Sequence, residues 1–367
     1  KLRLGWGKTG QQNITDNDYP YMGTYRISQE SAYYQFGNEW IATLRPSAYD
    51  KNIKWETTTT QNIGLDYSFY NDRISGSLDY YYRKTDDLIN NIAIPNGSNF
   101  SNYLITNVGT LENKGFEATL NLRPISTKDL SWDFGVNLSY NENKITKLTR
   151  TDDPNYMGVP TGGIGGGTGN NIQIQSVGHS INSFFVLHQV YGSDGMPIEG
   201  LYVDLSGQGG NVAGNLANYY HYKKPAPDYM IGLSTKLNYK NFDLALSGRI
   251  SIGNYVYNNV ASQTFYANLY NNSFWQNLST QIKDTKFNNA QYFSDTYIQN
   301  ASFFKMDNMS VGYNFSKILT DKIDGRISFT VQNAFTITKY KGIDPEVDGG
   351  IDNNFYPRAR VYMLGLN

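Results

Sequence analysis

The chain has 367 residues, of which 17% are charged and 15% are aromatic, with 31 Tyr, 18 Phe and 5 Trp. Its 31 basic and 32 acidic residues give no support to nucleic-acid binding, and the lack of Cys excludes disulfide scaffolds and Cys-ligated metal sites. A mean hydropathy of −0.52, with no run of about 20 apolar residues, excludes a membrane-spanning helix.

Apolar and polar residues alternate along ten stretches, and a period of two predicts strands with one apolar and one polar face. In chain order these predicted strands lie at 2–8, 62–69, 73–83, 116–123, 132–141, 229–239, 242–252, 309–315, 327–331 and 357–367. The third is the clearest, because Ile74 and Leu78 share one parity whereas Ser75 and Asp79 share the other. A further stretch, 184–191, is predicted as a strand inside a connector and not as a crossing of the membrane.

The predicted connectors alternate between short turns and long loops. Short turns are expected at 70–73, at Pro124, at 239–241 and at 321–325. Long connectors, of about 18 to 80 residues, are expected at 9–53, 85–110, 146–227, 253–295 and 339–356. Bacterial outer-membrane barrels combine short periplasmic turns with long outer loops, whereas a soluble β-sandwich, the alternative, usually has short connectors at both ends. The fold class is therefore predicted as all-β, a transmembrane antiparallel β-barrel.

The polar parity of these strands indicates how large that barrel is. It is rich in Asn, Ser, Asp, Arg and Gly, which suit a wet lumen, while charges facing lipid at mid-membrane would cost about 2–4 kcal/mol each. A small closed barrel has a filled or narrow interior, and a sheet with unpaired edges would aggregate. We therefore expect the chain to be the C-terminal part of a larger barrel.

Four phrases of the sequence carry a resemblance to a known family. They are LGWGKTGQQNI at 4–14, NVGTLENKGFE at 107–117, IDPEV at 343–347 and GGIDNNFYPR at 349–358. They resemble the C-terminal half of the SusC/RagA family, the TonB-dependent outer-membrane importers of Bacteroidetes. The resemblance implies a barrel of about 22 strands with an N-terminal plug, of which this chain supplies about the last ten. It also implies a SusD/RagB-like surface lipoprotein that lids the barrel and delivers oligosaccharides or oligopeptides.

The sequence departs from this family in three respects. Residues 1–367 are expected to be only the C-terminal portion of the receptor barrel, without a plug, TonB box or N-terminal domain. The end at Asn367 stops short of the terminal aromatic that is usual in the family. The stretch 201–210 lacks the later carboxylates of a calcium-loop-like segment that many relatives carry, so no metal is assigned there.

Motifs for catalysis and cofactor binding are weak. The glycine-rich stretch 162–169 does not complete G-x-G-x-x-G and has no following Gly-Lys-Ser/Thr, so it is interpreted as an outer-loop hinge and not a phosphate loop. His179, His188 and His221 lack the spacing of metal ligands and are expected in ordinary loop or packing roles. No Ser–His–Asp constellation can be assembled. An enzyme is not predicted, and neither is a cofactor.

The candidate binding residues lie in the connectors. Aromatic faces stack on sugar rings or peptide side chains, and the alternative for each of these residues is a place in the interface belt. The aromatic candidates are Tyr19, Tyr21, Tyr33, Tyr34, Trp40, Tyr156, Tyr219, Tyr220 and Trp275. Four acidic residues of the final loop could contact the lid or hold a cation such as calcium, the alternative being an ordinary solvated loop. They are Asp344, Glu346, Asp348 and Asp352.

Together these features predict active import across the bacterial outer membrane. Substrate would be captured between the lipoprotein lid and the outer loops, then released inward with energy transmitted through TonB. The alternative is a passive outer-membrane pore or a surface adhesion barrel that uses the same loops. An outer-membrane hydrolase would need a catalytic constellation that the sequence does not offer. The choice between glycan and peptide substrates stays open.

Overall fold

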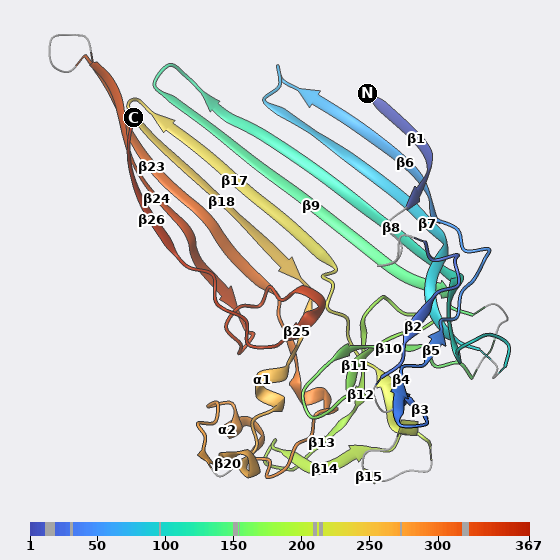
Figure 1. Cartoon of the computed structure of the whole chain (residues 1–367). Coiled ribbons are helices and arrows are strands. Elements are labelled where there is room, and N and C mark those ends of the chain that lie inside the picture. The colour runs from blue at the N-terminus through green and yellow to red at the C-terminus, as the bar shows by residue number, and fades with distance from the viewer. Residues whose placement is uncertain are drawn as a thin grey trace.

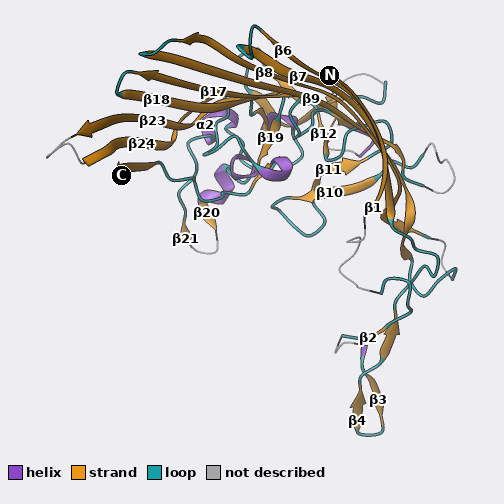
Figure 2. Ribbon diagram, turned by 90° about the horizontal axis from the view of Figure 1, so that it is seen from above, coloured by secondary structure: helices purple, strands orange, loops and turns teal. Residues whose placement is uncertain are grey.

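A single ten-stranded antiparallel sheet forms the wall of the computed structural model (Figure 1). The structure describes residues 1–367 except 12–18, 30–31, 95–96, 150–152, 154, 208–210, 213–215, 272–273 and 318–322. The wall strands are β1 (Leu2–Gln11), β6 (Glu56–Phe69), β7 (Ile74–Ala93), β8 (Tyr103–Ser126), β9 (Leu130–Lys147), β17 (Tyr229–Tyr239), β18 (Phe242–Ile252), β23 (Phe303–Lys317), β24 (Ile323–Thr338) and β26 (Val361–Leu366). Their spatial order is their chain order, so each connection joins neighbouring strands, and Figure 2 shows the sheet curving.

All ten predicted wall strands are present, and those at 229–239 and 242–252 match from end to end. The predicted connector 85–110 is wrong, because β7 and β8 stay paired as far as Ala93 and Tyr103. The predicted turn at Pro124 is also wrong: β8 continues to Ser126 through a bulge between Leu122 and Ile125. Proline is tolerated at a bulge because the missing amide hydrogen is not needed there.

The predicted strand inside a connector and the last predicted turn can also be compared with the structure. The stretch 184–191 indeed lies in a connector, as β12 (Ser183–Leu187) and β13 (Gln189–Tyr191), outside the wall sheet. The predicted turn at 321–325 lies partly outside the described residues, as do residues 208–210 of the calcium-loop-like stretch. Among the described residues, no helix is long and apolar enough to cross a membrane.

The two faces of the wall differ in polarity, as the alternation predicts. Strand register aligns a row of outward apolar side chains across seven strands: Leu4, Ile63, Tyr80, Phe116, Tyr140, Tyr229 and Ile252. The opposite face carries ion pairs, in which Arg3 contacts Asp66 at 2.8 Å and Asp79 at 2.9 Å. An apolar outer face and a charged inner face are what a barrel around a wet lumen requires.

The long connections gather at one end of the wall and form small sheets of their own (Figure 1). One sheet joins β10 (Val159–Gly163), β11 (Asn171–Gln175), β12 and β16 (Tyr219–His221). Another joins β13, β14 (Pro197–Val203) and β15 (Asn211–Val212), and a third joins β22 (Ile298–Asn300), β19 (Tyr255–Asn258) and β25 (Ile351–Asp352). The two described α-helices are single turns, α1 (Asn259–Ser262) and α2 (Ile282–Thr285). We call this assembly the loop layer.

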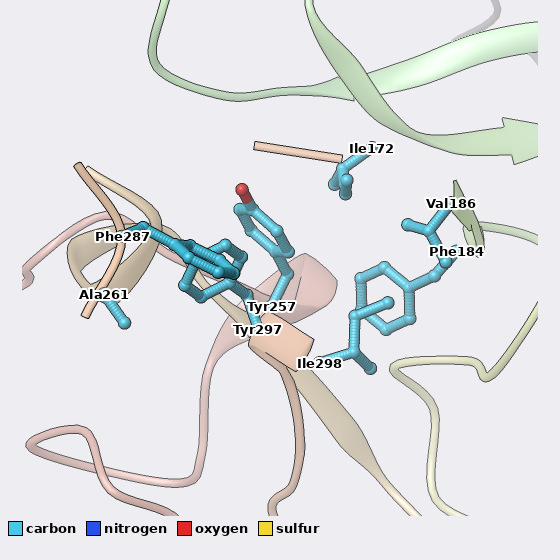
Figure 3. Packing of buried hydrophobic residues seen from close by; sticks show 8 residues of the cluster. All are labelled: Ile172, Phe184, Val186, Tyr257, Ala261, Phe287, Tyr297 and Ile298. Carbon is cyan, nitrogen blue, oxygen red and sulfur yellow. The ribbon is translucent and has the colours of Figure 1, made fainter. Parts of the chain in front are cut away.

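The hydrophobic core lies in the loop layer and not inside the wall (Figure 3). Its buried members come from two long connections: Ile172, Phe184, Val186, Tyr257, Ala261, Phe287, Tyr297 and Ile298. The inner face of the wall is largely polar, so this cluster forms where the connections pack on one another. The Tyr257 hydroxyl also donates a hydrogen bond of 2.7 Å to the carbonyl oxygen of Tyr292. The outer connections therefore form a packed unit over the end of the wall.

Candidate functional site

Tyr219 and Tyr220 lie on β16, which is held in the loop layer by pairing with β12. Because neighbouring side chains on a strand point to opposite faces, the two tyrosines have different surroundings. The ring of Tyr219 packs on Phe185 at 5.3 Å and on Phe293 at 5.5 Å between centroids, and burial raises its pKa to about 12. Two predicted binding residues are thus half-buried parts of the loop layer.

Tyr220 belongs to a hydrogen-bonded cluster centred on Asp295. The Asp295 carboxylate accepts hydrogen bonds from the Tyr220 hydroxyl at 2.7 Å and from the backbone N–H of Gln189 at 3.0 Å. Nδ1 of His188 lies 2.7 Å from the same carboxylate. Burial and the bond to Asp295 raise the pKa of Tyr220, so its hydroxyl stays protonated. Sequence reasoning missed this cluster, because His188 and Asp295 are 107 positions apart and no local motif links them.

His179 and His221 form a second unpredicted contact. Their rings stack with centroids 3.5 Å apart and planes at 12°. Burial, and secondarily the neighbouring His179, lower the pKa of His221 to about 4, and burial together with Lys144 lowers that of His179. Both imidazoles are therefore predominantly neutral near pH 7, which is what allows them to stack.

The neutral state of His221 predicts a pH dependence of stability. Its pKa falls from an ordinary 6.5 to about 4 on folding, so the unfolded chain binds a proton more readily. The contribution of His221 is fully present above pH 6.5 and is lost as the pH falls toward 4. Urea unfolding of the purified protein in detergent at pH 7.5 and pH 5 measures this loss, which should be smaller in His221→Gln. An identical loss in both proteins would contradict the assignment.

The remaining aromatic candidates are spread over the surface. Tyr34 and Trp40 are exposed on the hairpin of β3 (Tyr34–Phe36) and β4 (Glu39–Ile41), which extends away from the wall (Figure 2). Trp275 is 76% exposed on the hairpin of β20 (Tyr270–Asn271) and β21 (Phe274–Trp275). Three others, Tyr19, Tyr21 and Tyr33, precede the β3–β4 hairpin in the chain. The last, Tyr156, lies between β9 and β10. The structure does not bring the nine aromatic residues into one site.

The four acidic residues of the final connection have different environments. Asp344 and Glu346 both accept hydrogen bonds from Lys305, which is 1% exposed. Asp352 is buried and accepts a hydrogen bond of 2.6 Å from the Tyr340 hydroxyl, whereas Asp348 is exposed. The four carboxylates therefore do not converge.

Glu346 joins the final connection to two wall strands. It pairs with Arg249 of β18 at 2.8 Å, with Lys305 of β23 at 3.1 Å and with Arg358 at 2.6 Å. Arg249 and Lys305 are register partners on the inner face of the wall. Asp344 and Glu346 thus pair with positive charges of the protein itself, and the arrangement anchors the last outer loop to the wall.

The described residues contain no group of three or more His, Cys, Asp or Glu side chains placed to hold a metal ion. What they provide is aromatic surface on the loop layer and a polar inner wall below it. Such surfaces bind sugars and peptides by stacking and hydrogen bonding.

Comparisons with known proteins agree with this architecture. The family model described as "TonB dependent receptor-like, beta-barrel" matches residues 1–334. The chain is 45% identical to TonB-dependent receptor SusC of Bacteroides thetaiotaomicron, covering 100% of this chain and 37% of that protein. It is 31% identical to TonB-dependent receptor P3 of Formosa agariphila, covering 100% of this chain and 39% of that protein.

A solved structure of the RagAB peptide transporter contains a chain of the same fold. It superposes with a TM-score of 0.76 at 23% identity, covering all of this chain and 40% of that one. The chain thus spans about two fifths of the length of the relatives and structures that it matches. The family match, the barrel wall and the resemblance to the SusC/RagA group agree, and the chain belongs to the TonB-dependent receptor β-barrel family of the bacterial outer membrane.

Proposed function

We propose that this chain is the C-terminal part of the barrel of an active nutrient importer. The observation that carries the proposal is the division of the molecule into an apolar outer face, a polar inner face and a packed loop layer at one end of the strands. β1 and β26 are the edges of the wall, and further strands of the same protein would pair with them to close a larger barrel. The plug and the TonB-contacting segment would belong to the rest of that protein.

The proposed substrates are oligosaccharides or oligopeptides. They would contact exposed loop aromatics such as Trp40 and Trp275, whose faces suit sugar rings and peptide side chains alike. The RagAB peptide transporter shares the fold at 23% identity, which is too low to carry its substrate over to this chain, so both classes are proposed. We propose binding and passage of the ligand without bond cleavage.

The proposed partner is a SusD/RagB-like surface lipoprotein that closes over the loop layer. The packed core of that layer supports the proposal, because a partner needs a surface of fixed shape on which to dock. Asp348 is exposed and is a candidate for lid contact. Asp344 and Glu346 would contribute to lid binding indirectly, by holding in place the loop that carries Asp348.

Energy coupling is tested by uptake in cells. Cells that express the full-length protein should accumulate labelled oligosaccharide or oligopeptide, and deletion of TonB should reduce accumulation to the background of cells without the receptor. Double replacement of Trp40 and Trp275 by Ala should lower uptake at limiting substrate, with Ile41→Ala, on the same hairpin as Trp40, as the control. Uptake that persists without TonB would contradict active import and favour the passive pore.

A further inference from the structure

A hollow of about 510 Å³ lies where β9 extends beyond the end of its neighbour β17. β9 continues to Lys147, whereas the pairing with β17 ends at Tyr140 and Tyr229. Residues 178–181 lie along the uncovered edge of β9: the Ile145 amide donates to the carbonyl of His179 at 2.9 Å. The hollow is therefore a consequence of unequal strand lengths, and its lining comes from four separate parts of the chain. Its lining includes Glu142, Lys144, His179, His221, Lys223 and Lys224.

The charges around the hollow leave an excess of positive charge. Its two carboxylates are neutralised, since Glu142 pairs with Lys114 at 3.1 Å and Asp228 with Lys224 at 2.9 Å. Lys144 and Lys223 form no ion pair with any described residue. Lys223 is instead held between two aromatic rings, 5.3 Å from the centroid of Tyr222 and 5.1 Å from that of Tyr255. A fixed ammonium without a carboxylate partner is suited to an external anion.

The stacked histidines add hydrogen-bonding capacity to this charge. Nδ1 of His221 is buried and has no hydrogen-bond partner in the described part of the chain. Buried polar atoms of native proteins are nearly always paired, so this atom indicates a missing partner. The rings of His179 and His221 stack with centroids 3.5 Å apart, and both residues belong to the lining of the hollow.

We propose that this hollow binds a phosphate monoester, with Lys144 and Lys223 supplying positive charge and the His179–His221 pair supplying hydrogen bonds. A phosphate offers several acceptor oxygens around one centre, which matches donors arriving from β9, from the 178–181 segment and from β16. A carboxylate would satisfy fewer of these donors. The volume is in the range of small-molecule sites, so the hollow has room for a sugar that carries the phosphate.

The position of the hollow relative to the membrane surface indicates where the phosphate would come from. Lys144 has the same parity as Tyr140 and leaves the wall on its outward face. Tyr140 and Tyr229, with ring centroids 5.1 Å apart, occupy the position of the aromatic girdle just below it. Groups directly beyond the girdle lie among lipid headgroups. The favoured ligand is therefore the phosphorylated sugar headgroup of an outer-leaflet glycolipid.

Lipid retention by the purified full-length protein tests this site, without reference to transport. Native mass spectrometry in detergent compares a lipid with a phosphorylated disaccharide headgroup and the same lipid after dephosphorylation. We expect only the phosphorylated form to be retained, and the double variant Lys144→Gln/Lys223→Gln to bind it at least tenfold more weakly. Lys8→Gln is the matched control, because Lys8 is on the same outward face but does not line the hollow; its affinity should change less than twofold.

A second probe, glucose 1-phosphate, separates the two sources of phosphate. Its competition with the lipid would support the headgroup assignment, whereas its binding without any lipid retention would support the phosphate site but overturn the lipid source. Equal retention of both lipid forms, or equal weakening by Lys8→Gln and the double variant, would overturn the proposal. Folding is checked by gel mobility without heating, and the single variant Lys144→Gln, at an exposed position, gives a test if the double variant fails to fold.

Discussion

Arginine in place of Leu233 is expected to destabilise the folded barrel by about 2–4 kcal/mol, the range for a cation on the lipid face at mid-membrane. Leu233 lies near the middle of β17, whose ends are marked by Tyr229 and Tyr239. It shares the outward parity of both tyrosines, and its register partners are Val136 and Gly248. The guanidinium would therefore be placed in hydrocarbon, far from either interface.

Ser234→Arg is the matched control, because it places the same side chain one residue along on the inner face. Ser234 faces Gly135 and Ser247 across the neighbouring strands, and it borders a hollow of about 610 Å³ whose lining includes Arg123 and Asp133. We expect a change below about 1 kcal/mol, as for a solvated surface substitution. Urea unfolding in lipid vesicles measures both variants. Equal losses of stability would contradict the assignment of the two faces.

The contrast between these neighbouring positions also explains which elements could be predicted from sequence. β17 and β18 are predicted to the residue, because lipid on one side and water on the other impose a strict period of two. The parts of β7 and β8 nearest the loop layer are missed. Beyond the aromatic girdle both faces of these strands meet water, so polarity no longer alternates along them. There Lys84 and Asp86 share one parity and form an ion pair at 3.1 Å. The hydrogen-bonded ladder continues without leaving a pattern in the sequence.

The loop layer was less predictable for a different reason. Its core pairs residues such as Phe184 and Tyr257 from connections that are far apart in the chain, and short strands carry little periodicity. The same holds for the clusters at Asp295 and at His221, whose partners lie in other segments. The acidic residues of the final connection are recognisable as a group in the sequence, but Lys305 and Arg249, which determine what two of them do, lie in the wall.

That wall contact gives the second large expected effect. Lys305→Met should destabilise the protein by about 3–5 kcal/mol, because removal of one member of a buried ion pair leaves the other uncompensated. Nζ of Lys305 lies 3.0 Å from Asp344 and 3.1 Å from Glu346, and the side chain of Lys305 is 1% exposed. Methionine keeps much of the length of the side chain but cannot neutralise Asp344, whereas Glu346 keeps its pairs with Arg249 and Arg358. We therefore expect the final connection to detach from β23 and become sensitive to protease.

Lys341→Met provides the control on the same connection. Lys341 pairs with Asp284 at 2.8 Å, but the two side chains are 56% and 48% exposed, so water screens the pair. The expected loss is below about 1 kcal/mol. Urea unfolding gives the two free energies, and limited proteolysis followed by mass spectrometry locates the cleavage. If Lys305→Met is no more destabilising than Lys341→Met, and its final connection stays protected, then Asp344 and Glu346 do not anchor the loop and are again available to a lid or a cation.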